Sequence, residues 1–228
     1  MSPPDRPMPL GELLAEAIRV YGERPLAALG LGAVEAGAFL VADALPAILG
    51  VLLLALTFTA TFGAAARLVS GDSFAEAWAQ VGLRAPVLLV LTFVVAIPFA
   101  IAVGYLLLLI VAVFWIALAG FAIPVTMLER DPSAESFFDR LAYALYRSIR
   151  LARVEYLHAA GVSAALVLIY LLVGNVIGAA LVGFADNGRL VAGALVQLVL
   201  APLFFLGLAV LYYEQRARAA VSSRPEAA

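Results

Sequence analysis

A single acidic residue, Glu35, stands near the middle of an apolar run, in the sequence LGAVEAGAFL. A carboxylate at the centre of a membrane-spanning helix costs roughly 3 kcal/mol on insertion scales unless it is protonated or paired. Glu35 therefore has two interpretations, and the sequence leaves both open. Either it binds a proton, a cation or a polar substrate, or it is a protonated acid that links neighbouring helices by hydrogen bonds.

Two amide side chains stand in later apolar runs, at Asn175 and Gln197. Each can lie at a depth comparable to that of Glu35 and can hydrogen-bond to its carboxyl group. We therefore expect an intramembrane polar cluster of Glu35, Asn175 and Gln197. The threonines of the second apolar run can bond to carbonyls of their own helix and need no further role. They are Thr57, Thr59 and Thr61.

Other chemistry finds little support in the residue types present. The chain has no cysteine and one histidine, His158, which argues against thiolate or imidazole metal sites and against Ser/His or Cys/His catalysis. It contains no Walker loop, zinc motif, G-x-S-x-G or dinucleotide fingerprint. We expect a non-enzymatic protein with no metal, no cofactor and no nucleic-acid partner.

The composition predicts the elements that must position these residues. Hydrophobic residues make up 65% of the chain and charged residues 13%, far from the average for a soluble domain. Several runs reach the roughly 20 residues needed to cross a bilayer core. The sequence predicts an all-α integral membrane protein with six transmembrane helices, at about 25–45, 47–66, 86–104, 106–128, 158–183 and 190–213.

Amphipathic segments precede the first, third and fifth of these spans, at about 9–22, 73–84 and 132–156. Each segment places apolar residues on one helical face and charged residues on the other, which is typical of a helix lying in the membrane interface. Ser73 with Glu76 fits a capping box at the start of the second segment. The sequence thus predicts three hairpins of two spans, each preceded by a cytoplasmic-side interfacial helix.

The segment 132–156 has the clearest division into two faces, and Asp131 before Pro132 is a good helix start. Its apolar face comprises Phe137, Phe138, Leu141, Leu145, Ile149, Ala152 and Tyr156. The opposite arc carries Asp139 and the arginines Arg140, Arg147, Arg150 and Arg153. These arginines either contact anionic lipid headgroups, at roughly 1 kcal/mol per charge, or only anchor and orient the helix.

The remaining segments complete the predicted organisation. We expect a disordered N-terminal tail at 1–8, one membrane domain at 9–213 and a cytoplasmic tail at 214–228. The pattern of an interfacial helix followed by a hairpin recurs with a period of roughly 60 residues. The tripeptide AEA occurs at corresponding places, 15–17 and 75–77, and the sequence alone leaves a true internal duplication open.

Positive charge is distributed unevenly about the spans. The chain has 14 arginines and no lysine, and when the spans are paired as hairpins only Arg189 lies on one side. The opposite side carries Arg6, Arg19, Arg24, Arg67, Arg84, Arg130, Arg140, Arg147, Arg150, Arg153, Arg216, Arg218 and Arg224. Basic residues in short loops are retained on the cytoplasmic side, so both termini are predicted to be cytoplasmic. The abundance of alanine, with arginine in place of lysine, suggests a bacterial source and an inner-membrane location.

The sequence GNVIG at 174–178 places two glycines four residues apart in the fifth predicted span. Glycines at this spacing let a second helix approach closely, because neither carries a side chain at the contact. The pattern therefore predicts a tight helix–helix contact at Gly174 and Gly178. It does not decide between packing within one chain and packing between two copies.

Three stretches resemble a known group of bacterial membrane proteins. They resemble motifs of polytopic proteins related to the glycerophosphoryl diester phosphodiesterase membrane domain, and they are the segment from Ile123 to Glu129, the sequence ALYRSIRL at 144–151 and the sequence LYYEQRAR at 211–218. The N-terminal LGELLAEAIRVYGERP is similar to the usual opening of that family. Some members carry a separate soluble phosphodiesterase domain, for which this chain has no room. The resemblance implies a membrane domain without hydrolase activity.

Two functional hypotheses follow from these observations. The first is a non-enzymatic membrane module that engages membrane lipids or a membrane or cytoplasmic partner protein. The second is a small transporter or channel that uses the cluster around Glu35. A continuous polar cavity reaching Glu35 would favour transport, whereas a dry core with a lipid-lined groove beside the arginine-bearing helix would favour the module.

Overall fold

The computed structural model describes residues 4, 6–98, 108–129, 136–182 and 188–222. These residues are almost wholly helical, and no strand occurs among them. Five of the helices are long and apolar enough to cross a membrane, and a bent helix pair makes a sixth candidate. The predicted class, an all-α protein built from apolar helices of membrane-spanning length, is therefore confirmed.

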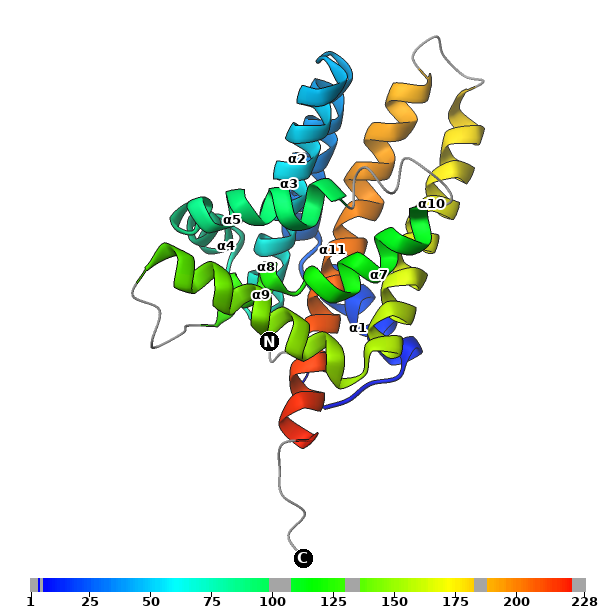
Figure 1. The fold of residues 1–228 in the computed structure, drawn as a ribbon. Helices are drawn as coiled ribbons and strands as arrows, with labels where there is room; N and C mark the ends of the chain where they lie inside the picture. The colour runs from blue at the N-terminus through cyan, green and yellow to red at the C-terminus, as the bar shows by residue number, and fades with distance from the viewer. Residues whose placement is uncertain (1–3, 5, 99–107, 130–135, 183–187, 223–228) are drawn as a thin grey trace, which may run out of the picture.

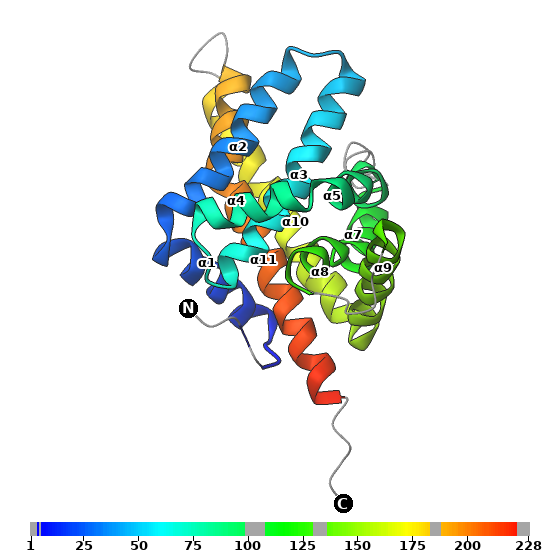
Figure 2. The ribbon, with the colours of Figure 1, turned by 90° about the vertical axis from the view of Figure 1, so that its left-hand side faces the viewer.

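The N-terminal third forms three helices, α1 (Leu10–Glu23), α2 (Pro25–Asp43) and α3 (Ala47–Val69). Arg24 leaves the helical conformation and Pro25 follows as the first residue of α2, where its missing N–H costs nothing. Pro46 likewise precedes α3. The short connection between the two long helices makes them run side by side (Figures 1 and 2).

Arg24 also ties this region to the next turn. Its guanidinium donates hydrogen bonds to the carbonyl oxygens of Gly71, at 3.1 Å, and Asp72, at 2.5 Å. Gly71 has a φ of 106°, in the left-handed region that glycine enters without a steric penalty. The α1–α2 junction is therefore held against the turn that ends α3.

The central third differs most from the predicted spans. It consists of α4 (Phe74–Leu83), α5 (Ala85–Leu91), the π-helical turn η1 (Thr92–Ala96), α7 (Leu109–Ala119) and α8 (Ala122–Leu128). The path bends by 78° between α4 and the segment Ala85–Ala96. The predicted span 86–104 lies partly outside the described residues. The predicted span 106–128 corresponds to the membrane-length candidate Ile110–Leu128, in which a turn near Gly120 separates α7 from α8.

The C-terminal third comprises α9 (Phe137–Val154), α10 (Tyr156–Val182) and α11 (Gly188–Ser222). Ser136 and Asp139 form a capping box at the start of α9, and the predicted start at Asp131 lies outside the described residues. Glu155 interrupts the helical conformation between α9 and α10. In both views the pairs α2–α3 and α10–α11 project beyond α5 and α7 (Figures 1 and 2).

Helix α11 lies at the centre of the bundle, packed against α1, α2, α3, α9 and α10. It continues well past residue 213, where the sequence analysis placed the end of the membrane domain and the start of the tail. Glu214 and Gln215 are fully buried, and Met8, expected in a disordered tail, is also buried. The length of an apolar run predicts where the hydrophobic residues end. The packed part of α11 continues beyond that point, because its charged side chains are buried against partners.

Gly32 of α2 makes a close helix–helix contact with α11. A Cβ at this position would lie 2.0 Å from the carbonyl oxygen of Leu198 on α11. The predicted glycine pair behaves differently: Gly174 packs against Val196 of α11, while a Cβ at Gly178 would meet nothing within 4 Å. The close contact is therefore made within the chain, and mainly by a glycine outside the GxxxG pattern.

We expect Gly32→Ala to destabilise the protein by about 1–3 kcal/mol, because the new methyl group must displace backbone. Gly37→Ala on the same helix is the matched control, since a Cβ there meets nothing within 4 Å. Thermal unfolding in detergent micelles, followed by circular dichroism, measures both. Equal midpoints for the two variants would contradict the assigned α2–α11 contact.

Candidate functional site

A cavity of about 170 Å³ lies between α2, α3, η1, α10 and α11. Glu35 reaches it from α2 and Gln197 from α11. The rest of the lining is mostly apolar and aromatic: Leu54, Ala55, Phe58, Ala96, Val167, Tyr170, Leu171, Ala201, Phe204 and Phe205. The structure thus brings two members of the predicted polar cluster to one hollow.

Glu35 is buried, with 5% of its surface exposed, and its two carboxyl oxygens have different surroundings. The Thr57 hydroxyl lies 3.4 Å from Oε2, which makes a long hydrogen bond at best. Neither Oε1 nor the hydroxyl of the neighbouring Thr61 makes a hydrogen bond of normal geometry among the described residues. A buried polar atom without a partner is unusual and calls for an explanation.

Thr57 and Thr59 bond to carbonyls of their own helix, as predicted. Thr57 Oγ1 donates to the carbonyl oxygens of Leu53 and Leu54, at 3.2 and 3.1 Å, and Thr59 donates to Ala55 at 3.0 Å. Thr61 departs from this prediction, because it makes no such bond and is buried beside Glu35.

Aromatic rings form one side of the cavity. The ring of Phe58 lies 5.1 Å from that of Phe205 and 6.3 Å from that of Phe204. Tyr170 of α10 packs against Phe204, at 5.8 Å, and interacts with Gln197 and Glu35. Tyr170 completes the polar corner of the cavity, a role that its place inside an apolar run did not indicate.

Asn175 does not join this corner. It is exposed, and its amide nitrogen donates to the carbonyl oxygen of Leu171 in its own helix, at 2.7 Å. It lines a neighbouring groove of about 300 Å³ that also includes Arg189. Tyr170 and Gln197 line both hollows and so stand between them. The predicted cluster is therefore divided, because Asn175 follows Tyr170 by five residues and so lies about 140° around the helix from it.

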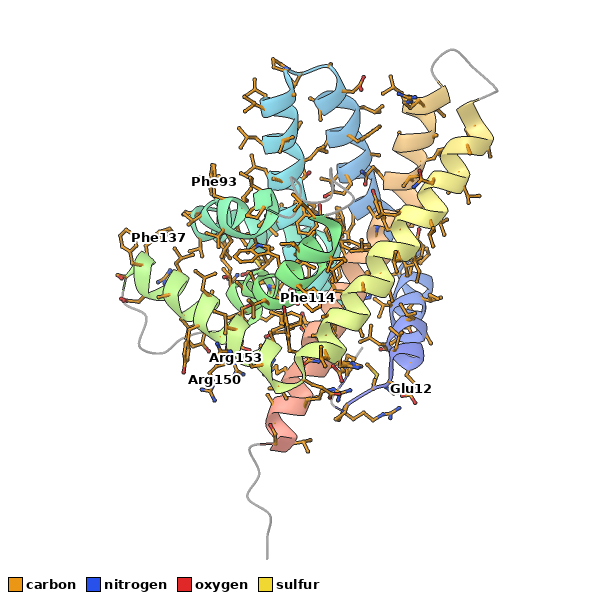
Figure 3. All side chains as sticks on the ribbon, turned by 45° about the vertical axis from the view of Figure 1, so that its right-hand side comes forward. Glu12, Phe93, Phe114, Phe137, Arg150 and Arg153 are labelled. Atoms are coloured by element: carbon orange, nitrogen blue, oxygen red, sulfur yellow. The ribbon has the colours of Figure 1, made fainter. Side chains whose placement is uncertain are left out.

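The arginines of α9 are also divided. Arg147 points inward and forms an ion pair with Glu129, at 3.0 Å. Arg140, Arg150 and Arg153 are exposed, and no ion pair to Arg150 or Arg153 occurs within the described residues. Arg150 lies over the ring of Tyr146, 6.0 Å from its centroid. Figure 3 shows Arg150 and Arg153 extending away from the bundle at the same end as Glu12.

The packed face of α9 is narrower than its apolar arc. The buried residues are Ala144, Ser148, Leu151 and Ala152. Phe138, predicted on the apolar face, is 74% exposed. Helical spacing identifies which residues of α9 share an apolar face. The neighbouring helices cover only part of that face. An apolar flank is left uncovered between the packed face and the exposed arginines.

Glu129 is the centre of a charged cluster that the sequence analysis did not single out as a site. Its carboxylate accepts hydrogen bonds from the hydroxyls of Tyr212, at 2.8 Å, and Tyr143, at 3.0 Å, and from Arg147, at 3.0 Å. Burial alone would raise the pKa of Glu129, but the bonds from Tyr212 and Arg147 outweigh it and lower the pKa. The cluster joins the end of α8 to α9 and α11.

A second charged cluster surrounds Glu214, farther along α11. Its carboxylate accepts from the side chain of Arg218 and from the backbone N–H of Met8, the latter at 3.3 Å. Arg218 also pairs with Glu155 at the α9–α10 junction, and His158 lies 3.6 Å from Glu214. These contacts fix both ends of the described chain to the same junction.

Both clusters use residues from the stretches that carried the family resemblance. Glu129, Arg147 and Tyr212 come from three different stretches and meet in one place, which their sequence positions alone did not indicate. No group of three or more His, Asp or Glu side chains arranged to hold a metal ion occurs among the described residues.

The apolar helices fit a multi-pass membrane protein. Comparison with protein-family models, with curated proteins and with solved structures gives no match for this chain. The resemblance to the glycerophosphoryl diester phosphodiesterase membrane domain therefore stays a sequence-based hypothesis.

We expect Arg147→Ala to reduce the free energy of unfolding by about 1–3 kcal/mol, because it leaves the largely buried Glu129 carboxylate without its cation. Arg150→Ala on the same helix is the control, since Arg150 is exposed and lies over the ring of Tyr146. Thermal unfolding in micelles compares the two. An equal loss in both variants would contradict the structural role of the Glu129 cluster.

The Glu129 cluster also predicts a pH dependence. The folded-state pKa is lowered from 4.5, so the cluster contributes stability above that pH and loses it as the pH falls through the folded-state pKa. We expect Glu129→Gln to lower stability at pH 7, and we expect its difference from the wild type to shrink as the pH falls below 4.5 and through the folded-state pKa of Glu129. Glu12→Gln, an exposed control, should change little. A difference between wild type and Glu129→Gln that does not vary with pH would contradict the assignment.

Proposed function

We propose that the protein is a non-enzymatic, multi-pass protein of the bacterial inner membrane that engages membrane lipids, with both termini cytoplasmic. Large apolar side chains exposed on the long helices support a lipid-facing surface. They include Leu26, Ile48, Leu172 and Val176, which are between 64% and 85% exposed. A soluble protein rarely leaves such a surface uncovered on several neighbouring helices.

The orientation is supported by where charge gathers. We use the term charged collar for α1, α9 and the last turns of α11, from Tyr212 to Ser222. The start of α1 and the end of α11 lie together, because Met8 contacts Glu214 and Arg218. Arg189 lies at the opposite end of α11. The retention of arginine on the cytoplasmic side supports a cytoplasmic position for the charged collar and for both termini.

The surface of α9 carries the lipid-binding proposal. It combines a stripe packed against the bundle, an uncovered apolar flank that includes Phe138, and the exposed cations Arg150 and Arg153. A helix of this kind can rest its flank at the acyl boundary while its cations meet anionic headgroups. In this arrangement α1, with exposed Leu10 and Ile18 beside its charged face, is a second interfacial helix.

The arrangement of spans proposed with this function is three hairpins, each following an interfacial helix. The α2–α3 and α10–α11 pairs support the first and third hairpins. The third interfacial helix would be α4, which bends sharply into α5. The family resemblance agrees with this proposal, because it implies a membrane domain without hydrolase activity.

Transport through a cluster of Glu35, Asn175 and Gln197 is less well supported. Asn175 bonds to its own helix outside the cavity, and the cavity wall is mostly apolar. Among the described residues that line the cavity, only Glu35, Tyr170 and Gln197 carry polar side chains.

We expect phosphatidylglycerol to stabilise the wild type in phosphatidylcholine nanodiscs, and the double variant Arg150→Ala/Arg153→Ala to lose about 2 kcal/mol of that effect. The matched control is Arg6→Ala/Arg19→Ala, which removes the same charge from arginines already paired with Glu12, Glu16 and Glu23. Thermal unfolding against the phosphatidylglycerol fraction measures the effect. An equal loss in both double variants would reduce the interaction to overall charge and contradict the proposal.

A further inference from the structure

The Glu35 cavity contains a buried carboxyl oxygen without a hydrogen-bond partner among the described residues, which the lipid-binding proposal does not explain. Glu35 is buried, and its Oε1 has no partner among the described residues. No arginine lines the cavity, and the chain contains no lysine. A carboxylate in such surroundings is stabilised by a proton or by a cation that is not part of the protein.

The walls of the cavity also favour a cation. Phe58, Phe204 and Phe205 come together there, with Tyr170 beside them. Aromatic faces attract ammonium groups, and the attraction strengthens where water is excluded. The combination of one carboxylate, several rings and an apolar wall fits a cation that carries hydrophobic substituents.

The size of the cavity sets the size of the ligand. An apolar protein cavity of roughly 150 Å³ accommodates benzene. The cavity of about 170 Å³ beside Glu35 therefore accepts one group of roughly benzene size, such as a trimethylammonium head. The neighbouring groove, reached past Tyr170 and Gln197, leaves space for a longer substituent. Arg189 lines that groove and not the cavity, so it does not neutralise Glu35.

From these observations we propose that the cavity is a binding site for a lipophilic ammonium compound, whose charged head pairs with Glu35 among the aromatic rings. The site is separate from the lipid-facing arginines of α9 and does not depend on them. It differs from a proton-only site, in which Glu35 would stay protonated and the cavity would accept neutral and cationic ligands alike.

Benzyltrimethylammonium and its uncharged carbon isostere, neopentylbenzene, test this proposal directly. Equilibrium binding of radiolabelled ligands to the full-length protein in phosphatidylcholine nanodiscs should favour the cation at least tenfold. Glu35→Gln, which keeps the side-chain shape, should weaken cation binding at least tenfold and leave the isostere within twofold. Glu35→Asp should restore part of the cation affinity.

Two further variants keep the experiment decisive. Asp43→Asn removes a carboxylate from the exposed end of the same helix and should leave binding unchanged. Ala201→Leu places extra volume in the cavity and should weaken binding of both ligands. Equal affinity for the two ligands, or a Glu35→Gln variant that binds the cation like the wild type, would overturn the proposal.

The variant Arg150→Ala/Arg153→Ala should bind the cation normally, so a failure of this site is distinguishable from a failure of lipid binding.

Discussion

The charged clusters on the last turns of α11 hold the rest of the structure in place. Glu129, Arg147 and Tyr212 connect α8, α9 and α11, and Glu214 with Arg218 connects α11 to the chain before α1. Charges removed from water require partners, and removing one partner leaves the other at a high energetic cost. These contacts therefore fix the direction in which α9 leaves the bundle and, with it, the face that its remaining arginines present.

Two regions of the bundle carry different kinds of chemistry. At one end, polar side chains satisfy one another in clusters, and Arg150 and Arg153 of α9 are exposed and form no ion pair within the described residues. Farther along α2 and α11, the apolar helices leave a single buried carboxylate whose Oε1 has no partner among the described residues. The first arrangement suits a surface that meets headgroups, and the second suits a small cavity that meets a ligand from the bilayer.

Apolar run length and local spacing predicted the features that depend on short stretches of sequence. The helices α2, α3 and α10 begin and end within a few residues of the predicted spans, and the Ser73–Glu76 capping box is confirmed. The inward turn of Arg147, the partners of Glu129 and the close approach of Gly32 to α11 depend on residues far apart in the chain. Periodicity places a residue on a face, but only the packed neighbours decide whether that face is covered.

The orientation of the charged collar is the claim from which the lipid-binding proposal follows. The chain has no cysteine, so single cysteines introduced at exposed positions report their own accessibility. Leu45→Cys lies in the α2–α3 turn, and Arg153→Cys lies on the exposed face of α9. A membrane-impermeant maleimide should label Leu45→Cys in intact spheroplasts and Arg153→Cys only after permeabilisation. Labelling of Arg153→Cys from outside, with Leu45→Cys protected, would contradict the account.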